Sequence, residues 1–190
     1  YARFAEDIRK GTRTLPDCAA RNAPISVKDM DAPRIDAERL NASLKAYKGA
    51  RPFMSAASPG VTTLFFRNDY YPSQEAYLFA IANAMRVEYE TVAAAGIVLQ
   101  IDCPDLAMGK HIKYYDVDLK TFRKAAQLNI EAMNHATANI PAEQLRMHVC
   151  WGNYEGPHHY DVPLADVIDL VFKARASYIS FEAANPRHAH

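Results

Sequence analysis

Short apolar runs separated by amphipathic stretches dominate the chain from residue 51 onward. Each run is followed by a polar or glycine-containing loop, a pattern typical of strands buried in a parallel sheet. The expected strands are Phe53–Ala57, Ile97–Ile101, Leu145–Cys150 and Tyr178–Glu182.

The stretches between these runs have the periodicity of helices. Residues Ser73–Ala95 carry apolar side chains at helical spacing, with Ser73 as the expected N-cap and Gly96 as the residue that ends the helix. A second helix is expected over Asp118–Asn139 and a shorter one over Leu164–Ala174.

Strand, long loop, helix and short turn in repetition indicate an α/β fold with a parallel sheet. An open doubly wound sheet and a closed (β/α)8 barrel both fit this order. No G-x-G-x-x-G motif follows a strand, and the long polar loops after the strands favour the barrel. We therefore expect one domain over residues 1–190 that is part of a (β/α)8 TIM barrel and a fragment of a longer protein. Residues 51–190 supply four βα units, and residues 1–50 are less regular, with one helix expected over Asp36–Tyr47.

Composition narrows the classes of function. The 22 basic and 22 acidic side chains balance, and no basic stripe indicates a nucleic-acid or membrane-surface partner. No apolar run reaches the roughly 18–20 residues of a membrane span, and no signal peptide is recognisable. The odd number of cysteines, three, favours a reducing compartment over a disulfide framework. The expected location is the cytoplasm, and a homo-oligomer is compatible with these features.

Candidate metal ligands gather at the ends of three expected strands. His148 and Cys150 are two residues apart, so a strand would present both on one side. Asp102 and Glu182 end the strands before and after this one, and the carboxyl ends of barrel strands form one rim. Imidazole, thiolate and carboxylate are ligands of zinc, so His148, Cys150 and Glu182 are the expected zinc ligands.

Further polar residues follow these strands. His158 and His159 stand in the loop after Cys150, where either is placed to donate a proton or to contact an anionic substrate group. Arg187, after Glu182, offers a fork of donors suited to a carboxylate, sulfonate or phosphate. A tandem histidine in a loop is more often a surface feature than a ligand. A loop salt bridge explains Arg187 as well as substrate binding does.

Four segments together point to a known family: Ser58–Leu64, Leu99–Ala107, Met147–Pro157 and Phe181–His188. Through them, residues 51–190 resemble the C-terminal catalytic barrel of cobalamin-independent methionine synthase. The resemblance extends to its short single-barrel relatives, including the epoxyalkane:coenzyme M transferases, and to the uroporphyrinogen decarboxylase-like type of barrel.

The resemblance implies a zinc-dependent methyltransferase or alkyltransferase, 5-methyltetrahydropteroyltriglutamate–homocysteine methyltransferase-like, with a zinc-bound thiolate as nucleophile. Its partners would be a small thiol and an alkyl donor, as in methionine biosynthesis. The family pattern assigns zinc to His148, Cys150 and Glu182 and substrate binding to Asp102, which is also a candidate catalytic residue with His158. His159 and Arg187 are the further candidate substrate contacts. The family's fourth ligand, a cysteine, has no counterpart in this chain, and Cys103 replaces a glutamate of methionine synthases.

Two other functions remain open from the sequence. A corrinoid-linked methyltransferase or a decarboxylase of the uroporphyrinogen decarboxylase-like barrels would share the architecture. A non-catalytic domain in which zinc only staples the fold would share the ligands.

Overall fold

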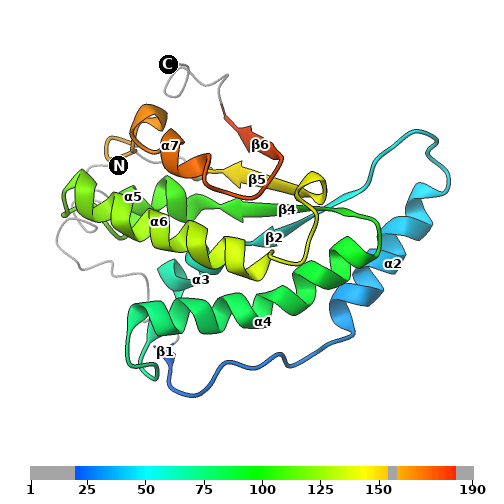
Figure 1. Cartoon of the computed structure of the whole chain (residues 1–190), viewed down its shortest axis with the longest axis horizontal. Coiled ribbons are helices and arrows are strands. Elements are labelled where there is room, and N and C mark those ends of the chain that lie inside the picture. The colour runs from blue at the N-terminus through cyan, green and yellow to red at the C-terminus, as the bar shows by residue number, and fades with distance from the viewer. Residues whose placement is uncertain (1–19, 154–157, 183–190) are drawn as a thin grey trace.

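The computed structural model describes residues 20–153 and 158–182. Its centre is a parallel sheet of four strands in the order β2 (Phe53–Ala57), β4 (Val98–Cys103), β5 (Leu145–Val149) and β6 (Tyr178–Phe181). All four expected strands are therefore present, parallel and adjacent in chain order (Figure 1). The fold is a mixed α/β arrangement with a parallel sheet, as the order of the elements predicted.

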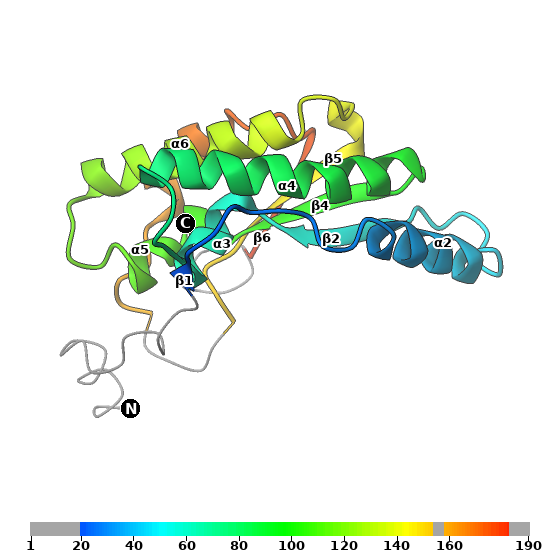
Figure 2. The same cartoon turned by 90° about the horizontal axis from the view of Figure 1, so that it is seen from below.

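Two long helices cover one face of this sheet. Helix α4 (Gln74–Ala94) begins after Ser73, whose side chain accepts a hydrogen bond from the Ala76 N–H, and Gly96 follows it with a φ of 75°. Helix α6 (Leu119–Ala136) is capped in the same way by Asp118. The two helices lie side by side on the same side of the strands (Figure 2). Both helix predictions are confirmed within a few residues at each end.

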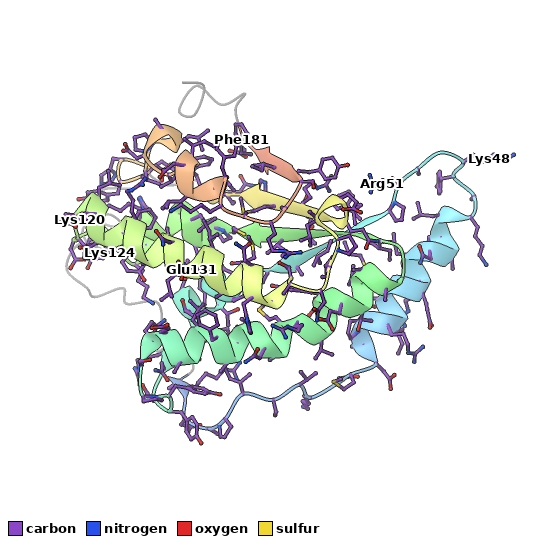
Figure 3. The ribbon with its side chains drawn as sticks, viewed as in Figure 1. Lys48, Arg51, Lys120, Lys124, Glu131 and Phe181 are labelled. Carbon is purple, nitrogen blue, oxygen red and sulfur yellow. The ribbon has the colours of Figure 1, made fainter. Side chains whose placement is uncertain are left out.

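The core lies between these helices and the sheet because successive strand residues point to opposite faces. Leu99, Ile101 and Met147 are almost fully buried and pack in one cluster with Tyr89 of α4 and Phe122 of α6. On the outer side of α6, by contrast, polar side chains are exposed to solvent; Figure 3 labels Lys120, Lys124 and Glu131. None of the helices in the described ranges is both long and apolar enough to cross a membrane.

Two segments expected to be loops are partly helical. Helix α3 (Pro59–Phe65) starts where we expected a loop, because Ser58 caps it and Pro59 suits the first turn. Helix α5 (Met108–Ile112), with the 3-10 turn η1 (Pro104–Leu106) before it, follows β4 directly. Both helices are short and begin in proline- or glycine-containing sequence, which hides them from a periodicity argument.

Two predicted helices differ from the structure. The expected helix over residues 164–174 is broken into the 3-10 turn η3 (Leu164–Asp166) and α7 (Ile168–Val171), because Val167 leaves the helical region with a φ of −133°. In the N-terminal part, α2 (Ala32–Leu44) starts earlier than expected because Pro33 suits its first turn, and it also ends earlier. The strands β1 (Ala20–Arg21) and β3 (Arg67–Asn68) pair in parallel and form a separate two-stranded sheet.

Candidate metal centre

The register of the sheet brings Asp102, His148 and Ser180 side by side on three neighbouring strands. Their sequence neighbours Ile101, Met147 and Ile179 pack against the helices, so these three residues belong to the opposite, open face. The expectation that residues at the strand ends converge on one rim is met for Asp102 and His148.

Asp102, His148 and Cys150 together form a group with the dimensions of a metal site. One ligand atom from each of the three residues lies within 4.8 Å of the other two. The shortest approach between the imidazole and the carboxylate joins His148 Nε2 to Asp102 Oδ1 at 3.9 Å. The three atoms are thus close enough to share one cation without being hydrogen-bonded to one another.

His148 is held in the tautomer that a metal ligand needs. Its Nδ1 lies 3.1 Å from the main-chain oxygen of Ser180. A carbonyl oxygen can only accept, so this hydrogen bond requires a proton on Nδ1 and leaves the lone pair on Nε2. A ligating histidine in metalloproteins typically has such a partner on its other nitrogen.

The surroundings of Cys150 disfavour the thiolate form of its side chain unless a cation is bound beside it. Burial raises the pKa of this thiol, and the negative charges of Asp102 and Glu182 raise it further, against the Gly152 N–H, which lowers it. That N–H donates to Cys150 Sγ over 3.3 Å. A sulfur surrounded by carboxylates holds its proton at neutral pH, whereas a bound cation would reverse the balance.

Asp102 contributes an oxygen that the described part of the chain does not satisfy. Its Oδ1 is buried, and no hydrogen bond from the described residues reaches it. Burial raises the pKa of Asp102, while the neighbouring His148 lowers it. A buried oxygen without a donor is costly unless a ligand or ion completes its coordination. The donor set, one nitrogen, one sulfur and one oxygen, fits zinc.

Glu182, the predicted third ligand, stands outside this close group. It is exposed, one residue beyond β6, and the pairing of Val149 with Phe181 makes Cys150 and Glu182 the next residues on their two strands. Its negative charge contributes to raising the pKa of the Cys150 thiol. In its place the structure brings Asp102 next to His148 and Cys150, although the sequence had indicated a catalytic or substrate-binding role for Asp102. The pairing of Asp102 with His148 across two strands would have identified Asp102, but a sequence alone does not show this register.

The predicted site residues His158 and His159 have different surroundings. The side chain of His158 is buried, with Nδ1 2.9 Å from Asp161 Oδ2. His159 is exposed, and its ring packs on Tyr160 with centroids 4.1 Å apart. Arg187 lies outside the described residues.

Cys103, which replaces a glutamate of methionine synthases, lies on the other face of β4. Its side chain is buried in the core, 3.6 Å from the sulfur of Met133. Position 103 therefore faces away from Asp102.

Beside the metal group lies a second polar cluster that the sequence reasoning missed. Asp105 is buried below the start of α3, where the Ser58 hydroxyl and the Asn129 side chain both donate to it. Burial raises the pKa of Asp105 to about 6 against these two hydrogen bonds. The main-chain N–H of Ser58 also donates to the Asp102 carbonyl over 3.0 Å, which links this cluster to the site.

Comparison with known proteins gives a distant similarity. No family model matches the chain. A stretch of 109 residues is 29% identical to proteins named methionine synthase from Saccharolobus islandicus, strains L.S.2.15 (Lassen #1) and M.14.25 (Kamchatka #1). It covers 56% of this chain and 28% of each relative, so the chain matches under a third of their length. This agrees with a resemblance to methionine synthases in general, whereas the resemblance to the short single-barrel relatives stays a prediction.

Proposed function

We propose that the protein carries out zinc-dependent S-alkyl transfer to a small thiol, in the manner of a methionine synthase. The observation that carries the proposal is the Asp102, His148 and Cys150 group, in which His148 presents the lone pair of Nε2. The similarity to proteins named methionine synthase supports methyl transfer as the reaction class.

The chain's own residues define what such a site would do. His148 Nε2 and Cys150 Sγ would hold the ion, with Asp102 or Glu182 as the carboxylate ligand. When bound, zinc would keep the acceptor thiol as a thiolate at neutral pH and so activate its sulfur toward an alkyl group. Asp102 and Glu182 lie next to the same sulfur ligand, so one carboxylate can bind the ion while the other contacts the substrate. His158 as a catalytic residue, with His159 and Arg187 as substrate contacts, completes the proposed set.

The fold proposal that accompanies this function is a (β/α)8 barrel. All-parallel sheets usually have both faces covered, and here the described helices α4 and α6 cover only one. The open face carries the polar row Ser55, Gln100 and Arg146 below the metal group, with a hydrogen bond of 3.1 Å from Gln100 Nε2 to Ser55 Oγ. Polar residues at the strand ends of a barrel interior are where its active site would lie.

Zinc binding by the metal-free chain tests the site. We expect one zinc per chain, and Cys150→Ser and His148→Gln should each weaken binding at least about 100-fold. Cys103→Ala is the matched control, because this cysteine lies in the core on the opposite face of β4. Equal zinc affinity in Cys150→Ser and the unchanged protein would refute the site.

Cobalt substitution then separates an enzyme from a structural staple. A cobalt ion bound by Cys150 should show a thiolate charge-transfer band, and addition of a small thiol should change it if a coordination position is open. A spectrum that does not respond to any thiol would favour the non-catalytic staple. The substitutions Asp102→Asn and Glu182→Gln, compared in the same assay, decide which carboxylate is the ligand.

A further inference from the structure

A buried carboxylate flanked by two histidines lies outside the metal group. Asp161 Oδ2 accepts a hydrogen bond from His158 Nδ1 at 2.9 Å, and Asp161 Oδ1 lies 4.0 Å from His111 Nδ1. The side chains of His111, His158 and Asp161 are 9%, 2% and 10% exposed. Three ionisable side chains buried this deeply are rarely left together without a role.

This cluster adjoins the segment that carries Cys150. The N–H of Met108, the first residue of α5, donates to the Cys150 carbonyl over 3.2 Å, and His111 follows one helical turn later. On the other side, the indole N–H of Trp151 donates to the Val162 carbonyl over 2.8 Å, next to Asp161. The cluster is thus tied on one side to the main chain of Cys150 and on the other to the side chain of Trp151.

The hydrogen bonding defines where a proton can be taken up. A carboxylate only accepts, so the His158–Asp161 hydrogen bond places a proton on Nδ1 and makes Nε2 the basic nitrogen. Burial lowers the pKa of His111, and the charges of His158 and His159 lower it further against Asp161. The rings of His159 and Tyr160 also pack against His111. The negative charge of Asp161 disfavours an anionic group at the cluster.

We infer that Asp161 is a positioning residue that orients His158 to accept the proton of the acceptor thiol, with His111 packed against the other carboxylate oxygen. The inference rests on the proposed thiol alkylation. In this step the S–H bond breaks, its electron pair stays on sulfur, and the proton passes to Nε2 of His158, which keeps it while the thiolate is bound. The hydrogen bond from Nδ1 of His158 to Asp161 holds the ring in one tautomer.

The first test reads the tautomer in the metal-free full chain. Nitrogen NMR of the imidazoles should show His158 protonated on Nδ1 in the unchanged protein and a mixture of tautomers in Asp161→Asn. Asp169→Asn is the matched control, because Asp169 pairs with Arg123 on the surface at 2.7 Å and does not contact the cluster. An unaltered His158 signal in Asp161→Asn would overturn the positioning role.

The second test follows the proton when a small thiol such as mercaptoethanol binds to the zinc-loaded chain. Calorimetry in two buffers of different ionisation enthalpy counts the protons released, and stopped-flow mixing gives the rate against pH. Near pH 7 the unchanged protein should release less than one proton per thiol. His158→Gln and Asp161→Asn should release a full proton and bind thiol about 100-fold more slowly, with the pH profile moved upward. Asp161→Glu should recover part of the rate.

The outcomes separate the two proposals. Loss of zinc or thiol binding in the unchanged protein would contradict the proposed function itself. Retained zinc binding, with proton release and pH profile unchanged in both His158→Gln and Asp161→Asn, would overturn the role of the cluster alone. Circular dichroism shows whether His158→Gln and Asp161→Asn fold. If one of them does not, the result for the other decides.

Discussion

Asp102 and Asp105 stand three residues apart at the end of β4, yet they serve opposite purposes. Asp105 is 1% exposed, and its carboxylate receives hydrogen bonds from Ser58 and Asn129. The side chain of Asp102 is 44% exposed, and its Oδ1 receives no hydrogen bond from the described part of the chain. A polar group whose bonds are completed inside the protein stabilises the fold, whereas one left incomplete beside other ligand atoms is available to a substrate or ion.

The Gly60→Ala substitution would test how tightly the Asp105 cluster is packed. A Cβ at position 60 would lie 2.1 Å from Asp105 Oδ2 and 2.7 Å from Asn129 Cγ, and both side chains are buried. We expect the free energy of unfolding to fall by about 3 kcal/mol or more, measured by chemical denaturation. In Gly109→Ala, where the nearest atoms are 3.8 Å away, the change should stay within about 1 kcal/mol. Equal effects at both positions would show that the cluster is not tightly packed.

The pH dependence of stability should reveal Asp105. Its pKa is about 6 in the folded protein against 3.8 for an ordinary aspartate, so folding takes up a proton between these pH values. The stabilisation is complete below about pH 3.8 and is lost as the pH rises through 6. It amounts to about 3 kcal/mol at most, at about 1.4 kcal/mol per pH unit.

Denaturation at pH 4, 5 and 6 gives the free energy of unfolding of Asp105→Asn and of the unchanged protein. The difference between their slopes against pH is the contribution of Asp105. Asp169→Asn is the control, because its pKa of about 2 places its titration below this window. An unaltered slope in Asp105→Asn would mean that Asp105 titrates normally.

The Ser58→Ala substitution separates capping from the support of Asp105. Ser58 accepts from the Val61 N–H over 3.0 Å and also donates to the buried carboxylate. We expect the free energy of unfolding to fall by about 2 kcal/mol, because a cap is removed and a buried acceptor loses its donor. Ser73→Ala, which removes a similar cap from α4 at a site exposed to solvent, should cost about 1 kcal/mol. Melting experiments give both losses of unfolding free energy, and their difference measures the hydrogen bond from Ser58 to Asp105.

The Asp102→Asn substitution should have the smallest effect on the fold and a large one on the site. In the metal-free chain we expect a change within about 0.5 kcal/mol, because no side-chain hydrogen bond to Oδ1 is lost. Zinc affinity should fall about 100-fold if Asp102 is the carboxylate ligand. Asp105→Asn should leave zinc affinity unchanged when measured in the folded state. If both substitutions changed only stability, the distinction between the two carboxylates would be wrong.

The strands, α4 and α6 were predictable because apolar periodicity and capping residues are local properties of the chain. The pair His148 and Cys150 was visible for the same reason, since alternation along one strand needs no tertiary information. By contrast, the approach of Asp102 to His148 depends on the register between two strands. Contacts such as Asp161 with His111 and Asp105 with Ser58 join distant segments through loops whose paths no local pattern specifies. The candidate metal site could therefore be located from the sequence, but its carboxylate could not be chosen.

The partner of His148 is a main-chain carbonyl, and this makes the site tolerant of change at position 180. Any residue that keeps β6 paired with β5 supplies the same oxygen, so selection can vary the side chain at this position without changing which imidazole nitrogen is free. The space beside the metal group can thus be reshaped for another substrate, through residue 180, while the orientation of His148 is inherited with the sheet.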